Sequence, residues 1–339
     1  MKTPMVRVRV PASTANLGPG FDALGMALSL YAWIEMEELP AGEKTHVELI
    51  GSELQGLPVD ESNLIVKVAY QVYDAANMPR VPLCVRIYSE IPLTRGLGSS
   101  ASAIVGGMVA ANALLGEPLS FDEIFKMSTE REDHPDNVGA ALYGGFVVNS
   151  WDGEGHQPNY LRLSPNANLA VMVAIPHFEL STEKARAALP AMYSRKDAIF
   201  NLSRTAMIVA ALTQGRLEYL ADAMRDRIHQ PYRAALVPGL QMILDGACNH
   251  GSIGAALSGA GPTILCFVDD RSGKHDEIEE FVATTLHNEN IEATIMWLEP
   301  SSFGVEVEIF MEPYMPRQNT LLEFAQERSG LAVGEVQQQ

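Results

Sequence analysis

A loop at residues 92–102 carries the clearest chemical signal in the sequence, because its glycines and serines adjoin an uncharged segment of small residues. Gly96 and Gly98 let the main chain approach a bulky anion without a Cβ in the way. Residues 99–115 are typical of a buried helix, which one of its first two serines would cap. Free N–H groups and the positive dipole end at such a helix start attract anions. The loop therefore predicts a phosphate site.

Two alternatives to a phosphate site follow from the same loop. The spacing Gly96-x-Gly98-x-x-Ala101 also fits the dinucleotide-binding fingerprint, but that motif needs a second strand ending in an acid about 20 residues on. Residues 121–124, which stand there, look like the start of a helix. A tight strand-to-helix turn without a ligand also explains the composition and stays open. The Walker P-loop is absent, because the only Gly-Lys pair of the sequence is followed by His275.

The turn at residues 11–22 consists almost entirely of small and turn-forming residues. Asn16 and Asp22 are its only strongly polar side chains apart from two hydroxyls. A carboxylate and an amide in so compact and apolar a turn are well placed to bind an ammonium and a hydroxyl. A plain loop explains the same composition equally well, so both interpretations stay open.

Four acids, a histidine and an asparagine gather at residues 130–137. An apolar, glycine-rich segment at 138–146 follows directly and is unlike an open surface, so we expect the acids to face a cleft rather than to form a solvated helix end. A carboxylate there suits magnesium, which prefers oxygen ligands and completes its shell with phosphate and water. For His134 we favour a structural hydrogen bond.

Two arginines stand in turns, Arg186 in a short helix capped at residues 181–182 and Arg233 after a proline-containing helix stop. Basic residues are scarce, with 24 lysines and arginines against 42 acids. A planar guanidinium binds a carboxylate through two parallel hydrogen bonds. We therefore predict that both arginines hold a carboxylate, with plain surface charge as the alternative.

The composition limits the class of protein. At 339 residues the chain is long enough for two domains or one large domain. A net charge of -18 disfavours nucleic acid and anionic membranes as partners, because both require a basic surface. Three widely spaced cysteines in apolar surroundings indicate buried thiols in a reducing compartment. Without a signal-peptide core or a membrane-length apolar run, a cytoplasmic protein is expected.

Hydrophobic periodicity predicts alternating strands and helices, and the fold class is α+β. Strands are expected at residues 6–10, 83–88, 169–176, 263–269, 291–298 and 305–309. Helices are expected at residues 63–74, 99–115, 120–132, 183–189, 201–227, 276–289 and 321–328, with a break near Gly215 in the longest. The segment at 151–168 is rich in Gly, Pro and Asn and places a domain change there. We expect the final residues to be disordered.

Three separated segments resemble one family, the GHMP small-molecule kinases. The motif Pro-x-x-x-Gly-Leu-Gly-Ser-Ser-Ala at residues 92–101 resembles their ATP loop, and residues 255–262 resemble their C-terminal glycine motif. The turn at 13–22 is similar to that of the homoserine kinases within this family, whereas mevalonate kinases and galactokinases carry a basic residue there. Further matches to that group lie at residues 134–137, 181–186 and 229–233. The resemblance covers about residues 5–311.

The resemblance implies phosphoryl transfer from ATP to the side-chain hydroxyl of L-homoserine, giving O-phospho-L-homoserine for threonine biosynthesis. It places the following residues at ATP: Asn63, Pro92, Arg95, Gly96, Leu97, Gly98, Ser99, Ser100, Ala101, Ser102 and Gly259. Magnesium (Mg2+) would lie at Glu132 with Ser99 or Ser100. Glu130 is the alternative ligand, because the helix length before His134 varies among relatives.

The same resemblance assigns the amino-acid pocket to Asn16, Asp22, His134, Asp136, Thr182, Arg186 and Arg233. The reacting hydroxyl would lie near Asp136 and Asn137. Because phosphoryl transfer passes through a loose transition state, positioning and charge stabilisation supply most of the rate, and a strong base is not required. We therefore favour a positioning role for Asp136 over the role of a base.

The family implies an N-terminal ATP-binding domain at residues 1–160 that contains a left-handed β-α-β unit. A ferredoxin-like domain at 161–312 would follow, and a partly disordered tail at 313–339 lies beyond the resemblance. ATP and homoserine would bind between the two domains, and homodimers are common in the family. The alternatives are a different GHMP-type small-molecule kinase and a catalytically inactive, ligand-binding regulator with the same fold.

Overall fold

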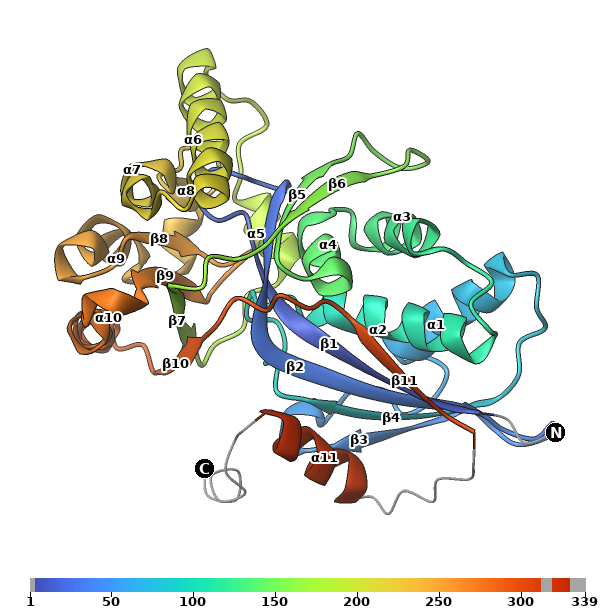
Figure 1. Ribbon diagram of the computed structural model, residues 1–339. Coiled ribbons are helices and arrows are strands. Elements are labelled where there is room, and N and C mark those ends of the chain that lie inside the picture. The colour runs from blue at the N-terminus through green and yellow to red at the C-terminus, as the bar shows by residue number, and fades with distance from the viewer. Residues whose placement is uncertain (1–3, 312–318, 330–339) are drawn as a thin grey trace.

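The computed structural model describes residues 4–311 and 319–329, and in this part of the chain the strands form two sheets (Figure 1). The first is a seven-stranded sheet with the path β11-β1-β2-β4-β3, which β5 and β6 extend from β2. Its strands are β1 (Met5–Ala15), β2 (Leu24–Glu38), β3 (His46–Ile50), β4 (Leu83–Ser89), β5 (Phe146–Ser150), β6 (Asn159–Leu163) and β11 (Glu306–Phe310).

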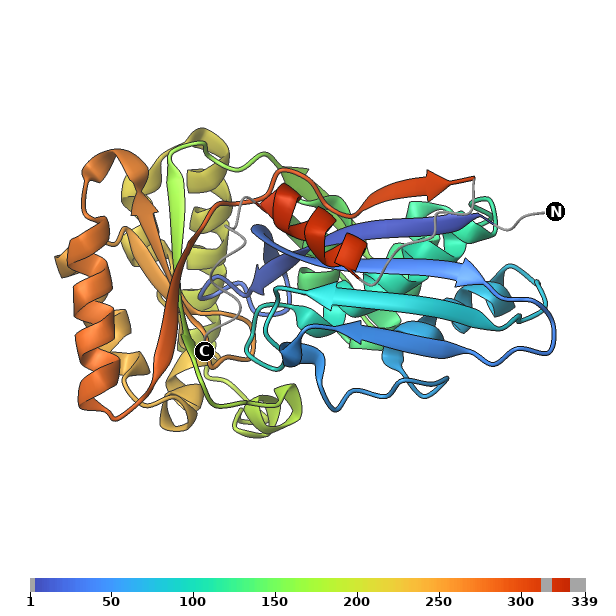
Figure 2. The same cartoon turned by 90° about the horizontal axis from the view of Figure 1, so that it is seen from below.

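One face of this sheet is covered by four helices, α1 (Leu64–Ala75), α2 (Ser99–Leu114), α3 (Phe121–Glu132) and α4 (Asp136–Tyr143) (Figure 2). The uncharged α2 packs against β1 on one side and against α1 and α3 on others, which is why it has no polar face. Strands β3 and β4 pair in parallel, and α1 connects them in the sequence, so the three elements form the expected β-α-β unit. Its left-handed crossover stays a prediction.

The second sheet is four-stranded and wholly antiparallel, in the order β10-β7-β9-β8. Its strands are β7 (Leu169–Pro176), β8 (Gly254–Leu257), β9 (Ile264–Asp269) and β10 (Ala293–Leu298). Helices α5 (Thr182–Ala187), α6 (Arg195–Gln214), α7 (Leu220–Ala223), α8 (Gln230–Arg233) and α9 (Leu240–Gly246) stand between β7 and β8, and α10 (His275–Asn288) follows β9. This β-α-β-β-α-β sequence confirms the ferredoxin-like expectation.

The two sheets share one hydrophobic cluster, so they meet without a flexible linker. Leu17 and Leu24 from the N-terminal turn pack in this cluster with Val171 of β7 and Phe267 of β9. The long strands β1 and β2 reach from the first sheet to the edge of the second (Figure 1). The turn that joins them, which carries Asn16 and Asp22, is thereby held at the junction.

Most predicted elements are present, with corrections at their ends. Asn63 caps α1, because its side chain accepts the Ile65 N–H at 2.9 Å. The expected serine cap of α2 is wrong: Gly98, in the left-handed conformation, is the N-cap and offers no side chain. The helix expected at 201–227 begins earlier and ends before Gly215, and the short α7 follows it.

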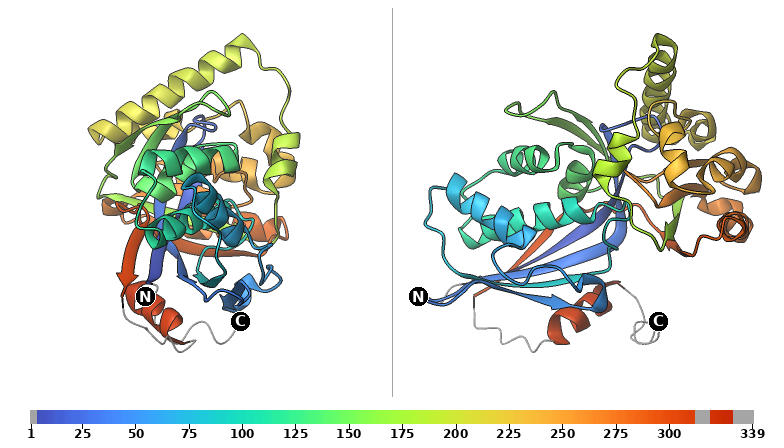
Figure 3. Two further views of the ribbon diagram at one scale, coloured as in Figure 1. Left: turned by 90° about the vertical axis from the view of Figure 1, so that its right-hand side faces the viewer. Right: turned by 180° about the vertical axis from the view of Figure 1, so that it is seen from behind.

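The division of the chain into domains is less regular than residue ranges suggest. The expected boundary at residue 160 falls inside β6, which pairs with β5 of the first sheet. Strand β11, expected with the C-terminal domain, returns to pair with β1. Helix α11 (Asn319–Ser329) then packs on the sheet face opposite α1–α4 (Figure 3). The disorder predicted for the chain end falls on residues outside the described part. No helix of the described chain is both long and apolar enough to cross a membrane.

Candidate active site

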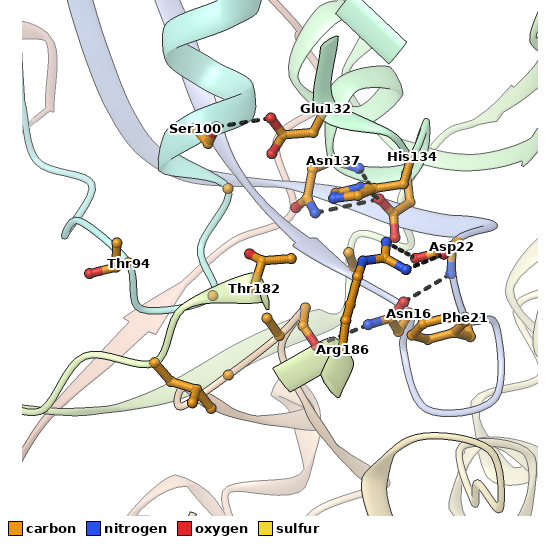
Figure 4. A pocket seen from close by; sticks show the side chains of 18 of the residues that line it. Asn16, Phe21, Asp22, Thr94, Ser100, Glu132, His134, Asn137, Thr182 and Arg186 are labelled. Atoms are coloured by element: carbon orange, nitrogen blue, oxygen red, sulfur yellow. Dashed lines mark hydrogen bonds and ion pairs between the residues drawn. The ribbon is translucent and has the colours of Figure 1, made fainter. Parts of the chain in front are cut away.

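Side chains from segments beside both sheets converge on a cavity at the junction (Figure 4). Fourteen predicted site residues line it: Asn16, Asp22, Gly96, Gly98, Ser99, Ser100, Glu132, His134, Asp136, Asn137, Thr182, Arg186, Arg233 and Gly259. Segments that are distant in the sequence therefore form one site, as their combined motifs predict.

At two positions of the loop at residues 92–102, the main chain lies too close to its neighbours for any side chain to fit. Gly98 has φ +72°, and a Cβ there would lie 2.0 Å from Ser13 Oγ. Gly96 has φ +78°, and its Cβ would lie 2.3 Å from the Ser258 carbonyl oxygen. Both contacts hold the loop against the junction, and Ser99 and Ser100 at the start of α2 line the cavity. A helix start with free N–H groups beside a cavity suits an anion.

The C-terminal glycine motif supports this loop from the other sheet. Ser258 Oγ lies 2.6 Å from the carbonyl oxygen of Gly96, to which it donates, and 2.8 Å from Thr14 Oγ1. Gly259 accepts hydrogen bonds from Asn16 Nδ2 at 2.9 Å and from Arg233 Nη1 at 3.0 Å. The motif therefore joins the phosphate loop to the polar end of the cavity.

Four loop residues predicted at ATP do not bring their side chains to the cavity. Leu97 and Ala101 are fully buried in the hydrophobic core. Arg95 donates from Nε to the Pro176 carbonyl at 3.0 Å and from Nη2 to the His177 carbonyl at 3.1 Å, so its side chain ties the loop to the end of β7. Pro92 lines neither this cavity nor the apolar one beside it.

Glu132 contacts the start of α2, beside the glycine loop. Ser100 Oγ donates to Glu132 Oε2 at 2.9 Å, so Ser100 rather than Ser99 contacts this acid. Burial raises the pKa of Glu132, against the opposing charge of His134. Glu130 lies outside the cavity, where its carboxylate accepts the Gly155 N–H at 3.0 Å. The geometry thus favours Glu132 over Glu130 as a ligand beside the loop.

The N-terminal turn presents a charged pair to the other end of the cavity. Arg186 donates from both terminal nitrogens to the two oxygens of Asp22, at 3.0 and 2.9 Å. Burial and the charge of Asp136 raise the pKa of Asp22, while Arg186 lowers it. Asn16 accepts the Asp22 N–H at 3.0 Å, and both residues have positive φ, so the turn holds them in a strained conformation.

A second charged pair lies at the start of α4. His134 Nδ1 lies 2.6 Å from Asp136 Oδ1, which also accepts the Asn137 N–H at 2.7 Å. Burial lowers the pKa of His134, but the charge and hydrogen bond of Asp136, together with the charges of Glu132 and Asp22, outweigh burial and raise it to about 9. The ring is therefore a cation at neutral pH, and its contact with Asp136 is the hydrogen bond expected for His134. Asn137 Oδ1 accepts from Ser13 Oγ at 2.9 Å, and its amide nitrogen donates to Asp136 Oδ1 at 3.4 Å.

Arg233 is almost completely buried at the cavity wall. Its Nε donates to the Ala185 carbonyl at 3.1 Å, and no partner of its Nη2 occurs among the described residues. Burial and the charge of Arg186 lower the pKa of Arg233 to about 10, so the guanidinium stays charged at neutral pH. Thr182, at the start of α5, points its hydroxyl into the same space (Figure 4).

Comparison with known proteins agrees with this geometry. Residues 63–145 match the model for the GHMP kinase N-terminal domain, and residues 208–288 match the model for the GHMP kinase C-terminal domain. The chain is 46% identical to homoserine kinase of Deinococcus radiodurans over 301 residues, which cover 89% of this chain and 96% of that protein. The chain belongs to the homoserine kinase family.

Other members of the homoserine kinase family are similar over comparable lengths. The protein from Moorella thermoacetica is 40% identical over 303 residues, 89% of this chain and all of that one. The crystal structure of homoserine kinase from Cytophaga hutchinsonii superposes with a TM-score of 0.80 at 27% identity, covering 91% of this chain and 98% of that structure. The two-domain GHMP kinase fold is thereby shown for this chain.

A second and mainly apolar cavity adjoins the glycine loop. Thr94, Ser99 and Ser100 line both cavities. Asn63 lines the apolar one and donates from Nδ2 to the Pro58 carbonyl at 2.7 Å, so it shapes the wall as well as capping α1. Ser102 lines it too.

Sequence reasoning missed most of the wall of this apolar cavity. Leu54, Leu57, Pro58, Leu64, Ile65 and Ile87 line it, yet none carries a chemical signal in the sequence. In the charged cavity Phe21 and Thr94 were also missed. Thr94 stands inside the loop motif itself, so its position was a signal that could have found it.

Proposed function

We propose that this chain transfers the γ-phosphoryl group of ATP to the side-chain hydroxyl of L-homoserine, giving ADP and O-phospho-L-homoserine, a step of threonine biosynthesis. The observation that carries the proposal is one cavity in which a helix-start phosphate loop faces two charged pairs. ATP would place its base in the apolar cavity and its phosphates at Gly96, Gly98 and the start of α2.

The charged end of the cavity suits a zwitterionic amino acid. Asp22 and Arg186 form a bidentate ion pair at the cavity wall, and an amino acid offers the opposite charge to each of them. The substrate ammonium would bind Asp22 with the Asn16 amide nearby. Its carboxylate would bind Arg186 and the partnerless Nη2 of Arg233, because guanidinium groups recognise carboxylates through paired donors.

The chemical step needs an alcohol held in line with the γ-phosphorus atom. The substrate oxygen bonds to phosphorus, the bond from phosphorus to the β–γ bridging oxygen breaks, and the hydroxyl proton leaves to solvent or to a cavity acceptor. Asn137 would orient the hydroxyl. Asp136 Oδ1 is already engaged by His134 and by the Asn137 N–H, which supports a positioning role over that of a base.

The residues beside the loop fit magnesium. Ser100 Oγ and Glu132 are hard oxygen donors next to the helix start, and the buried carboxylate faces the positions where phosphates would lie. We propose Glu132 with Ser100 or Ser99 as its protein ligands. When bound, the ion neutralises charge on the phosphate oxygens. The homodimer and the cytoplasmic location stay predictions.

The test of this function is an ADP-release assay on the purified chain with homoserine, serine, threonine and mevalonate. We expect turnover with homoserine and at least about tenfold lower kcat/KM with the shorter serine, because a chain one carbon shorter leaves the hydroxyl out of line. Preference for mevalonate would indicate a different GHMP-type kinase. Absence of turnover with all four alcohols would indicate the inactive regulator.

A further inference from the structure

His229 lies fully buried between the segments that form the amino-acid end of the cavity, yet it touches no part of the space itself. Its Nε2 is 2.6 Å from the carbonyl oxygen of Gly18, in the turn that carries Asn16 and Asp22. Its Nδ1 is 3.3 Å from Arg233 Nη1. One ring therefore joins the N-terminal turn to the buried arginine.

The two partners of His229 allow one protonation state. A carbonyl oxygen only accepts, so Nε2 must carry a proton. A guanidinium only donates, so Nδ1 must present a lone pair to Arg233. The ring is therefore neutral with its proton on Nε2. Burial also lowers the pKa of His229 and so favours the neutral ring. The charge of Asp226, whose Oδ2 lies 3.6 Å from Nε2, opposes this effect of burial.

The position of the ring is set by its own backbone. The Asp226 carboxylate accepts the N–H groups of Ile228 at 2.9 Å, His229 at 2.9 Å and Gln230 at 2.7 Å. Gln230 Oε1 in turn accepts the Leu257 N–H at 2.7 Å, at the start of the C-terminal glycine motif. Such a network keeps the imidazole at one place between its two partners.

Phe21 completes the arrangement on the cavity side. Its ring lies 5.4 Å from the His229 ring, and the guanidinium carbons of Arg186 and Arg233 lie 5.5 and 5.3 Å from the same ring. Arg233 is thus held by two carbonyl oxygens, an aromatic face and the Nδ1 lone pair. Without that lone pair, Nη1 of Arg233 loses one of the acceptors that fix the orientation of the guanidinium.

We propose that His229 is a positioning residue for the phosphorylation of homoserine: as a neutral Nε2–H ring it orients Arg233 toward the substrate carboxylate and locks Arg233 to the turn that bears Asn16 and Asp22. This inference rests on the proposed function. It assigns to a residue outside the cavity a selective effect on amino-acid binding, while ATP binding remains independent of it.

The test compares two amide substitutions of similar size. In His229→Asn the amide oxygen replaces the Nδ1 acceptor for Arg233, whereas in His229→Gln the amide nitrogen reaches the position of Nε2 and donates to Gly18. We expect His229→Gln to raise the KM for homoserine at least about tenfold and His229→Asn clearly less, with the KM for ATP changed under about twofold in both. Equal effects of the two variants, or a parallel rise in the KM for ATP, would overturn the proposal.

A substrate without a carboxylate separates positioning of Arg233 from a general structural role. With 3-aminopropan-1-ol, which is homoserine lacking its carboxylate, we expect wild type and His229→Gln to have similar kcat/KM. A persistent loss in the variant would contradict the proposal. If wild type does not turn over homoserine, the proposed function fails, which is a separate result from any difference between variants.

The tautomer can be measured in the wild-type protein even if both variants fold poorly. Nitrogen-15 NMR of labelled histidines distinguishes a neutral ring protonated at Nε2 from one protonated at Nδ1 and from the imidazolium. We expect the Nε2–H neutral form for His229 at pH 7, identified by the signal lost in the variant that folds better or by through-bond assignment. Either other form would overturn the proposal.

Discussion

Asp136 is the single residue on which the choice between positioning and base catalysis depends. Replacing Asp136 with Asn removes the anion that pairs with His134 and that raises the pKa of its ring. Because a charge-assisted hydrogen bond is worth about 1.5–3 kcal/mol, we expect the KM for homoserine to rise by roughly tenfold or more. Steady-state kinetics with both substrates would measure it. A normal homoserine affinity with a collapsed chemical step would assign Asp136 as a base instead.

Glu132 tests the magnesium assignment, and its neighbour Glu130 provides a matched control. Glu132→Gln keeps the shape of the side chain and removes its charge, so we expect the magnesium concentration for half-maximal rate to rise by about tenfold or more. Glu130→Gln should leave it unchanged, since Glu130 binds Gly155 outside the cavity. Titration of the rate with magnesium would show this difference. An unaltered response in Glu132→Gln, with a raised requirement in Glu130→Gln, would move the ligand to Glu130.

His134 predicts a pH dependence of stability. Its pKa is about 9 in the folded protein against an ordinary value of 6.5, so the protonated ring stabilises the fold fully below about 6.5. That contribution is lost as the pH rises through 9. We expect the difference in unfolding free energy between wild type and His134→Gln to shrink by roughly 1–3 kcal/mol between pH 6 and 9.5. Urea unfolding at both pH values would reveal this, and a constant difference would refute a charged His134.

The residue types of the site could be predicted from the sequence, but their pairings could not. Asp22 and Arg186 are 164 positions apart, and their bidentate contact depends on how two sheets meet. The motif that includes Arg95 and Leu97 likewise does not predict that both side chains point away from the cavity. Motif position reports the course of the main chain, whereas side-chain direction is decided by tertiary packing.

At the scale of elements, the phosphate loop and α2 act together through the left-handed glycines. Gly98→Ala would place a Cβ 2.0 Å from Ser13 Oγ at φ +72°. We expect a loss of about 1–3 kcal/mol in unfolding free energy and a kcat/KM for ATP at least about tenfold lower, because the loop must shift away from the phosphates. Chemical unfolding and kinetics with ATP would test both effects.

Gly116→Ala is the matched control for that experiment. Gly116 has φ +80° but open space around its Cβ position, so it carries the backbone strain without the clash. We expect a comparable backbone cost in Gly116→Ala and an unchanged KM for ATP. Equal losses of ATP use in the two variants would show that close packing of the loop is unimportant.

Elements with a strong pattern were predictable, and those set by context were not. The period of β4 and the capping box of α3 determine those elements locally. Helix α4 was not predicted, since its eight residues are mostly small and apolar and fit several conformations. The serine cap of α2 failed because the tight approach to Ser13 places glycine at the cap.

At the scale of the whole molecule, α11 covers an aromatic face far from the chemistry. Leu321 and Ala325 bury Trp33 and Tyr88, while Phe324 lies 4.2 Å from the Arg7 guanidinium. No described residue of α11 lines either cavity at the phosphate loop. We therefore expect the cover of this face by α11 to affect stability rather than catalysis.

Ending the chain after Met311 tests this separation. We expect the unfolding free energy to fall by about 2–4 kcal/mol and the emission of the exposed Trp33 to shift to the red, with kcat/KM for homoserine unchanged within about twofold. Denaturant unfolding followed by fluorescence, together with kinetics, would measure these effects. A selective loss of activity at unchanged stability would assign α11 a catalytic role.

The molecular plan was predictable only in outline. Alternating elements indicate an α+β fold, and the family resemblance supplies two domains. The pairing of β11 with β1 could not be predicted from the sequence, because nothing in a strand of five residues indicates which strand it pairs with. The shared cluster of Leu17 with Val171 and Phe267 arises from the same long-range closure, and it puts the cavity where ATP and an amino acid can meet.

The most direct test of the central claim is a balance of products. Phosphorus-31 NMR of the chain with ATP, magnesium and L-homoserine follows ADP and the new phosphomonoester in one sample. We expect one O-phospho-L-homoserine for each ADP, with formation dependent on homoserine. ADP without the phosphomonoester, or no reaction at all, would contradict it.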